Sequence, residues 1–291
     1  MKKPSAGYRK LKEKWKSRHN ELSREIFDKH GRTFEWLSDN SRQLAIGSLA
    51  GFFLLTQPIA VKIPTTLSTP SAQALRITDK KVFLVYDLRS VLPDNVQPLT
   101  IEQQKQVSDI LSRDFGISVA PEISGIRLNS VYGLIGQEQH LSRYPGDNMF
   151  THFQDSQSAN DYWQFGMAPG LGGWGYFASS KYNLTQKDID REKYYIAVQT
   201  FLAPGFYNNP QKYLEFFKYR KMLVVNPQNG RAVVADIADA GPAPWTGKQL
   251  GGSPEVMSYL QRSDGAQVGG VLYFFIDDPN DTIPLGPLNP L

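Results

Sequence analysis

One aspartate stands where a strand-like apolar run gives way to a Gly-Pro turn. Asp239 ends the run that contains Ile237-Ala238 and precedes Ala240-Gly241-Pro242. Apolar neighbours withdraw a carboxyl group from water, which raises its pKa toward the range of a useful general acid/base. The alternative role is structural, with the carboxylate accepting hydrogen bonds from backbone N–H groups of the turn.

Two other polar clusters could supply chemistry. Glu138-Gln139-His140, together with Arg143–Asp147, lies between apolar segments and is either a second source of carboxylate or a network within a turn. The run Asp277–Asp281 (DDPND) brings hard oxygen ligands close together but lacks the spacing of an EF-hand, which is more typical of a solvated loop.

Composition narrows the chemistry further. The 291 residues include no cysteine, which excludes disulfides, thiolate nucleophiles and cysteine-based metal sites. Only four histidines occur, two of them in the first 30 residues, which argues against a histidine-rich metal centre. No P-loop, G-x-S-x-G or H-x-x-x-H motif is present. We therefore expect neither a metal nor a cofactor.

The net charge of +4 is concentrated at the N-terminus. Residues 1–43 contain 12 basic and 6 acidic residues, whereas the remaining 248 contain 20 basic and 22 acidic ones. The body of the chain therefore gives no support to nucleic-acid binding. Within residues 1–42, Trp15, Leu22 and Ile26 recur at helical spacing among basic residues, which predicts a basic amphipathic helix on the inner leaflet. A solvated helix or tail is the alternative.

An uncharged run follows. Residues 43–61 (QLAIGSLAGFFLLTQPIAV) carry no charge, and such a helix would span about 28 Å, close to the hydrocarbon core of a membrane. The preceding basic segment predicts a single-pass anchor in a bacterial cytoplasmic membrane, with residues 1–42 cytoplasmic and the body outside. The alternatives are a buried core helix and a signal peptide cleaved after Ala72-Gln73-Ala74, although 42 residues is long for an n-region.

Residues 62–78, rich in Thr, Ser and Pro, predict a linker, and residues 79–165 a small α+β subdomain. Within the latter, Lys81–Leu88 (KVFLVYDL) is typical of a buried strand. Thr100 and Gln103 form a capping-box pattern that begins a helix ending at Gly116. Its predicted apolar face consists of Ile101, Val107, Ile110, Leu111 and Phe115.

Residues 166–277 are dominated by strand and turn signals, and residues 278–291 by prolines that predict an irregular tail. A Gly-rich loop covers Gly166–Gly175, and strands are expected at Tyr194–Phe201 and Val271–Ile276. Met222–Val225 and Arg231–Ile237 flank Asn-Gly, the strongest short hairpin signal. The predicted fold is mainly β with α+β additions.

The segment from Met222 (MLVVNPQNGRAVVADIADAGP) resembles the double-psi β-barrel of the rare lipoprotein A and expansin families. Their pattern is V-x-N-x-x-N-G-R-x-V-V-V-x-V-x-D-x-G-P. The matching residues are Val225, Asn226, Asn229, Gly230, Arg231, Val233, Val234, Asp239, Gly241 and Pro242. The resemblance covers roughly residues 166–277 and is specific over about twenty residues.

The resemblance implies an open groove that binds cell-wall polysaccharide. Catalytic members use an aspartate as general acid/base, and Asp239 occupies that position. Lytic transglycosylases of this class protonate the glycosidic oxygen and let a hydroxyl of the sugar close a ring. Two departures stand out: Ala240 replaces the family's arginine, and Gln249–Ser253 lacks its second aspartate. Asp236 and Glu255 are possible substitutes, but period-2 alternation would place Asp236 on the face opposite Asp239.

Aromatic residues in the flanking loops complete the predicted site. Trp174, Tyr176 and Trp245 suit stacking on sugar rings, although a tryptophan in a Gly-rich turn packs into the hydrophobic core about as often. Together with Glu255 they are our candidate substrate-binding residues, and Asp239 is the candidate catalytic one. We expect a membrane-anchored enzyme that acts on peptidoglycan or a related glycan. The alternative is a non-catalytic envelope module that binds glycan or a protein partner, or a subunit of an envelope assembly, including a homo-oligomer.

Overall fold

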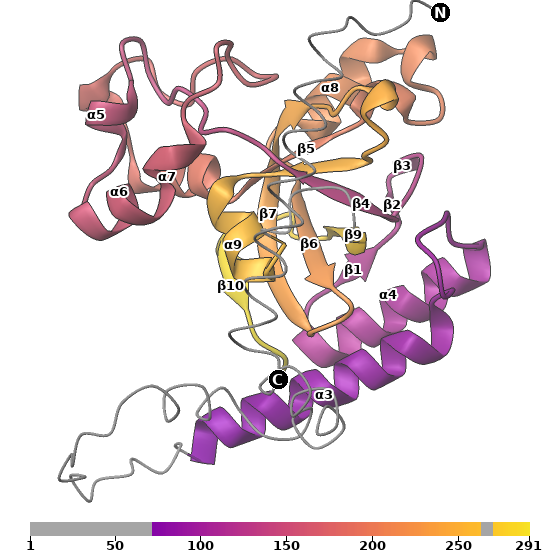
Figure 1. The fold of residues 1–291 in the computed structure, drawn as a ribbon. Coiled ribbons are helices and arrows are strands. Elements are labelled where there is room, and N and C mark those ends of the chain that lie inside the picture. The colour runs from indigo at the N-terminus through magenta and orange to yellow at the C-terminus, as the bar shows by residue number, and fades with distance from the viewer. Residues whose placement is uncertain (1–71, 263–269) are drawn as a thin grey trace, which may run out of the picture. The chain divides into compact units, whose positions relative to one another are not determined.

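The computed structural model describes residues 72–262 and 270–291 (Figure 1). The predicted basic segment 1–42 and membrane anchor 43–61 lie outside these residues. Among the helices of the described ranges, none combines the length and apolarity needed to cross a membrane. The helices are α3 (Ala72–Val91), α4 (Ile101–Phe115), α5 (Met149–His152), α6 (Ser156–Tyr162), α7 (Gln186–Lys193), α8 (Pro210–Phe217) and α9 (Pro254–Leu260).

The strands are β1 (Val119–Ala120), β2 (Glu122–Ile123), β3 (Ile126–Arg127), β4 (Tyr132–Gln137), β5 (Tyr195–Val198), β6 (Lys221–Asn226), β7 (Arg231–Ala240), β8 (Leu250–Gly252), β9 (Gly270–Ile276) and β10 (Gly286–Leu288). Short 3₁₀ helices occupy Trp163–Phe165, Lys181–Asn183, Thr200–Leu202, Phe206–Asn208 and Pro244–Thr246.

Six of the strands close into a mixed β-barrel (Figure 1). Around the barrel the order is β4, β8, β5, β7, β6 and β9, and β9 pairs back onto β4. The pairs β4/β8 and β5/β7 are parallel and the other four are antiparallel. The expectation of a β-rich barrel is thus confirmed.

Alternation along the strands divides the apolar side chains between two cores. Each barrel strand contributes to one buried cluster, the barrel interior, for example through Ile135, Ile196, Val224, Ile237, Leu250 and Phe275. Neighbouring residues on β6, β7 and β9 point outward and pack with α3 and α4 in a second cluster. Figure 1 shows these two helices lying together along one side of the barrel. The barrel wall is therefore a rigid platform for the polar residues at its ends.

The predicted hairpin is confirmed as β6 and β7. Asn226 pairs with Arg231 at its end, and Gly230 adopts a φ of 69° that favours glycine. Asn226 Oδ1 accepts a hydrogen bond from the backbone N–H of Gln228 at 3.0 Å, which fixes the turn. Strand β7 continues to Ala240 and so carries Asp239 to the end of the barrel.

Helix α4 also begins and ends as predicted. The Thr100 side chain accepts from the backbone N–H of Gln103, the Gln103 side chain accepts in return, and Gly116 is left-handed at the C-terminus. Val107, Leu111 and Phe115 are buried, but Ile101 is 77% exposed, so its inclusion in the apolar face was wrong. As the first helical residue, it lies beyond the second core.

The strand predicted at Lys81–Leu88 is wrong, because these residues lie within helix α3. Leu84 and Leu88 are fully buried, while Val82, Phe83 and Tyr86 are more than 60% exposed. The buried pair is spaced by four residues and therefore follows the helical period. The β-branched and aromatic composition of the run was misleading, because tertiary packing of Leu84 and Leu88 overrides intrinsic strand preference.

Truncating Leu84 and Tyr86 separately distinguishes the two structures of this segment. We expect Leu84→Ala to lower the free energy of unfolding by about 2 kcal/mol, the low end for a buried leucine because a peripheral helix can relax. Tyr86→Ala should change it by less than about 0.5 kcal/mol, since the side chain is exposed. In a strand the two residues would share a face. Equal losses in urea denaturation would contradict the helix.

Strands from outside the predicted barrel segment also contribute to the barrel. The described residues form one compact unit, in which β4, assigned from sequence to the α+β subdomain, lies between β8 and β9. Helix α3 begins at Ala72, inside the predicted linker. The tail is not wholly irregular, since β10 pairs with β7. Residues on both sides of position 166 therefore contribute strands to the barrel.

Candidate active site

Four strands place a row of small residues beside Asp239. Asp239 lies opposite Ala197 on β5, Ala197 opposite Gly251 on β8, and Gly251 opposite Gly136 on β4. Cross-strand partners point to the same face of a sheet. Their neighbours Ile196, Leu250 and Ile135 fill the barrel interior, so this row lies on the outer surface. Glycine and alanine leave that surface open to longer side chains from its edges.

A β-bulge sets the direction of Asp239. Ile196 pairs with Ile237 and Ala197 with Asp239, so Ala238 is an extra residue in β7. The carboxylate is half-buried, and its Oδ1 accepts from the backbone N–H of Ala240 at 2.8 Å. Burial raises the pKa of Asp239, while the backbone N–H groups of Ala240 and Gly173 act in the opposite direction. Asp239 therefore shows both features expected from the sequence as alternatives, a raised pKa and a hydrogen bond with the backbone of the turn.

The same bulge corrects the expected orientation of Asp236. Asp236 pairs with Tyr195 and Asp239 with Ala197, two β5 residues on one face, so the aspartates share a side of the sheet. Asp236 nevertheless has different neighbours. It is fully buried, and Arg191 Nε lies 3.4 Å from its Oδ2. It is therefore not the second carboxylate of the Asp239 site.

Glu138 provides that second carboxylate. It directly follows β4, and its backbone N–H donates to the Gly252 carbonyl at 2.9 Å. Its carboxyl group lies over Gly251, where a Cβ would collide with it. Burial and the negative charge of Asp239 raise the pKa of Glu138 to about 7, against the effect of Lys248. A carboxyl group whose pKa is raised by burial and by a neighbouring carboxylate is suited to acid/base chemistry.

Glycine at position 251 is needed for this placement. We expect Gly251→Ala to push the Glu138 carboxyl group toward water, which lowers its pKa toward the usual glutamate range. The expected cost in unfolding free energy is about 1–3 kcal/mol from overpacking. Carbon-detected NMR titration of Glu138 measures the shift. Gly170→Ala is the control, because a Cβ there meets nothing within 4 Å. An unchanged Glu138 pKa in Gly251→Ala would contradict this geometry.

Gln199 holds the loops around the pair. Its side-chain amide donates to the carbonyls of Pro242 and Lys248, each at 3.0 Å. These two carbonyls belong to the turn after β7 and the loop before β8. The Lys248 side chain in turn lies over Gly136, at the end of the row of small residues. The site thus comprises Asp239, Glu138 and Lys248 on a floor of glycine and alanine.

The predicted aromatic residues divide into two groups. Trp174 faces the protein, since its indole N–H donates to the Ile237 carbonyl at 2.8 Å and its ring packs against the core. Tyr176 is 40% exposed and Trp245 is 88% exposed. Of the three, Tyr176 and Trp245 present rings to solvent, whereas Trp174 supports the loop whose Gly173 contacts Asp239.

Glu255 belongs to a different cluster. It is buried near the start of α9, and burial together with the negative charge of Glu192 raises its pKa to about 7. The same cluster contains the Arg143–Asp147 ion pair, with Arg143 Nε 2.8 Å from Asp147 Oδ2. The network within Arg143–Asp147 is therefore present, while Glu138, from the same sequence cluster, belongs with Asp239.

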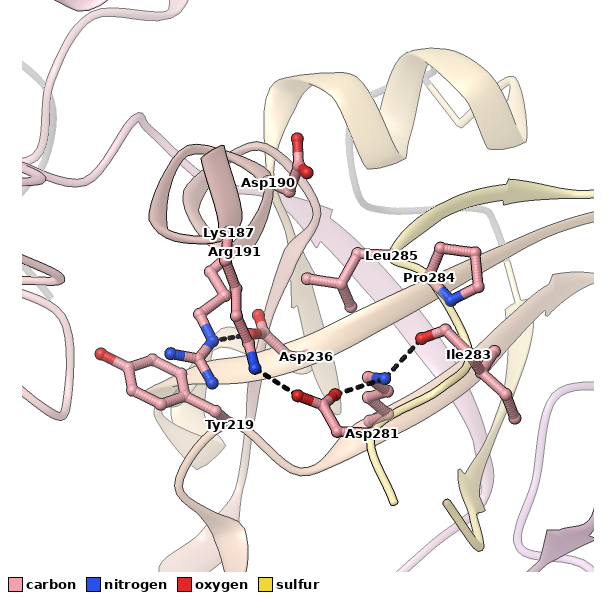
Figure 2. A pocket seen from close by; sticks show the side chains of 10 residues that line it. Lys187, Asp190, Arg191, Tyr219, Asp236, Asp281, Ile283, Pro284 and Leu285 are labelled. Carbon is pink, nitrogen blue, oxygen red and sulfur yellow. Dashed lines mark hydrogen bonds and ion pairs between the residues drawn. The ribbon is translucent and has the colours of Figure 1, made fainter. Parts of the chain in front are cut away.

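A further polar pocket of about 260 Å³ lies between α7, β7 and the segment after β9 (Figure 2). Asp236 lies at its inner side, and burial raises the pKa of this carboxyl group well above the usual range. Asp281 pairs with both Lys187 and Lys221, the latter at 2.6 Å. Lys187 and Lys221 pair with Asp281, and Arg191 pairs with Asp236, so each cation of this pocket has a carboxylate partner. We therefore assign the pocket a structural role, in which its ion pairs join the C-terminal segment to the barrel.

The Asp277–Asp281 run takes part in these ion pairs between the C-terminal segment and the barrel. Asp278 accepts from the backbone N–H groups of Thr282 and Ile283, each at 2.9 Å, and its side chain is 4% exposed. Lys221 Nζ donates to it at 2.7 Å. The solvated loop favoured from the sequence is therefore wrong for Asp278, because the backbone folds around its carboxylate.

Comparison with protein-family models, with curated proteins and with solved structures finds no match for this chain. Any functional assignment therefore depends on the residues of the site and on the strand order of the barrel.

Proposed function

We propose that this chain is an envelope enzyme that cleaves peptidoglycan or a related wall glycan, in the manner of a lytic transglycosylase. The observation that carries the proposal is the carboxyl pair Asp239 and Glu138, each with a raised pKa, on the outer face of the barrel. The order of hairpin, aspartate and Gly-Pro turn in the double-psi families supports it, as does the closed six-stranded mixed barrel. The predicted anchor at residues 43–61 would hold the enzyme at the membrane.

In the proposed mechanism, Asp239 and Glu138 together hold one proton. The pair donates its proton to the glycosidic oxygen as the bond to the anomeric carbon breaks. A hydroxyl of the same sugar attacks that carbon, and its proton passes to the vacated carboxylate. The product is an anhydro sugar, water is not consumed, and the pair regains its starting protonation. Two carboxyl groups with raised pKa values, one of them raised partly by the charge of the other, suit both halves of this cycle.

Product analysis tests the proposal. The purified full chain is incubated with isolated peptidoglycan, and the released fragments are examined by mass spectrometry. We expect anhydro ends. Reducing ends would indicate hydrolysis by the same carboxyl pair and overturn the transglycosylase mechanism. Wall binding without products would favour the non-catalytic module, for which the exposed Trp245 is a suitable contact. Neither products nor binding would overturn the proposal altogether.

The pH profile of cleavage should depend on Lys248. Activity that needs the proton of the pair falls as pH rises through the pKa of Glu138, about 7. Lys248 favours the charged form of Glu138, so Lys248→Gln raises this pKa and moves the alkaline limb to higher pH. Loss of about 1 kcal/mol of attraction corresponds to roughly 0.7 pH unit. Rates measured between pH 5 and 9, with the exposed Lys212→Gln as control, check the shift; a limb that stays in place would contradict it.

A further inference from the structure

A second cluster, separate from the carboxyl pair, combines two histidines with a glutamate in the protein interior. His140 follows β4, His152 ends α5 and Glu192 lies in α7, and all three are at most 4% exposed. His152 Nε2 lies 3.0 Å from Glu192 Oε2, and His140 Nδ1 lies 3.4 Å from Glu192 Oε1. One ligand atom from each of the three lies within 4.8 Å of the others. Two imidazoles and one carboxylate at this separation are a metal-binding donor set.

The surroundings orient these donors. Asp147 Oδ2 lies 3.1 Å from His152 Nδ1, which directs Nε2 of the same ring toward Glu192. Asp147 is itself fixed by the side chain of Arg143 and by the Arg143 backbone N–H at 3.0 Å. The backbone N–H of Leu141 donates to Glu192 Oε1, also at 3.0 Å. A carboxylate behind a histidine is the usual outer shell of a metal ligand.

Two buried atoms at this cluster lack partners. Among the residues that the structure describes, His140 Nε2 and Glu255 Oε2 make no hydrogen bond. Burying a polar atom without a partner is costly, so such an atom calls for a ligand. Glu255 is close enough to His140 and Glu192 for their charges to act on it. A small cavity lined by His152, Glu192 and Glu255 connects with this cluster.

We propose that His140, His152 and Glu192 bind a Zn²⁺ ion. Two imidazoles and a carboxylate combine nitrogen and oxygen donors, and such a mixed set in a buried site suits zinc. Binding requires that His152 Nε2 carry no proton, so zinc replaces the proton that otherwise joins His152 to Glu192. The ion would join α5 and α7 to His140, which lies two residues after Glu138. This proposal does not depend on glycan cleavage.

The test uses the full chain after treatment with a chelator that is then removed. We expect one equivalent of Zn²⁺ to bind, as measured by elemental analysis after gel filtration, and to raise the Tm. Co²⁺ should give the visible absorption bands of a tetrahedral site. A native, folded protein that takes up neither ion in stoichiometric amount would overturn the proposal.

Variants then locate the site. His140→Gln should weaken Zn²⁺ binding by more than about 100-fold. Replacing a residue that only hydrogen-bonds to a metal ligand already lowers metal affinity by about 10–100-fold, and loss of the ligand itself should cost more. Its fold should survive, since the polar contact of the His140 ring, from Nδ1 to Glu192 Oε1 at 3.4 Å, is one that a glutamine amide can also make. The double variant His19→Gln/His30→Gln removes the other two histidines and should bind like wild type. If His140→Gln is unfolded, Glu192→Gln replaces it, and Glu215→Gln, the same exchange at an exposed residue of α8, is the matched control. Wild-type affinity in the cluster variant that folds would contradict the assignment.

Discussion

Replacing Asp239 with asparagine is expected to lower the rate of glycan cleavage by at least about 100-fold, the usual contribution of a general acid/base. The exchange keeps the size of the side chain and an oxygen that can accept from Ala240, but it removes one of the two carboxyl groups between which the mechanism moves its proton. Rates of release of anhydro fragments by wild type and variant measure the loss. Wall binding by co-sedimentation should be unchanged, since it does not need the proton.

The stability of this variant separates the catalytic role from a structural one. Because burial raises the pKa of Asp239, the folded state disfavours the ionised form, and ionisation costs stability as pH rises through the usual aspartate range. Asp239→Asn should therefore be at least as stable as wild type at pH 7. Asp190→Asn, an exchange outside the site on α7, is the control. Wild-type activity in Asp239→Asn would remove Asp239 from the mechanism.

Replacing Asp147 with asparagine is expected to lower the free energy of unfolding by about 3–5 kcal/mol, because it leaves a buried cation without its counterion. Arg143 is 3% exposed, and both its Nε and its second guanidinium nitrogen contact Asp147. His152 loses the same partner. Chemical denaturation in the presence of a chelator measures this effect independently of any metal.

The matched control and the pH dependence make this prediction specific. Asp155 caps α6 at the surface by accepting from Ser158 N–H at 2.8 Å, and asparagine caps equally well, so Asp155→Asn should be nearly neutral. Burial would raise the pKa of Asp147, but hydrogen bonds from His152 and Arg143 outweigh it and hold this pKa well below the usual range. The stabilisation is therefore present above about pH 4 and is lost in acid. A loss below about 1 kcal/mol at pH 7 would contradict it.

Local signals in the sequence predicted the local structures. The Asn-Gly turn and the Thr100 capping box depend on residues within a few positions of one another, and both are confirmed. Lys81–Leu88 failed because its helix is stabilised by contacts with β6, β7 and β9, which no window of sequence contains. Asp239 was chosen as the candidate because its sequence neighbours are apolar and the resemblance points to this position.

The rest of the site depends on pairings between distant strands. Glu138 meets Asp239 only because β8 and β5 lie between β4 and β7. A signal was available, since Glu138 follows an apolar strand-like run as Asp239 does, but nothing in the sequence fixes the order of those strands. The bulge at Ala238 is likewise invisible from the sequence, and it reversed the expected orientation of Asp236.

The position of β9 in the barrel has a consequence for how the chain folds. β9 is the last barrel strand in sequence, yet it lies between β4 and β6. Until residues 270–276 are available, both of those strands keep an unpaired edge, and the ring stays open. Such long-range pairing closes slowly and exposes edges that aggregate. We therefore expect truncation before residue 270 to prevent closure of the barrel.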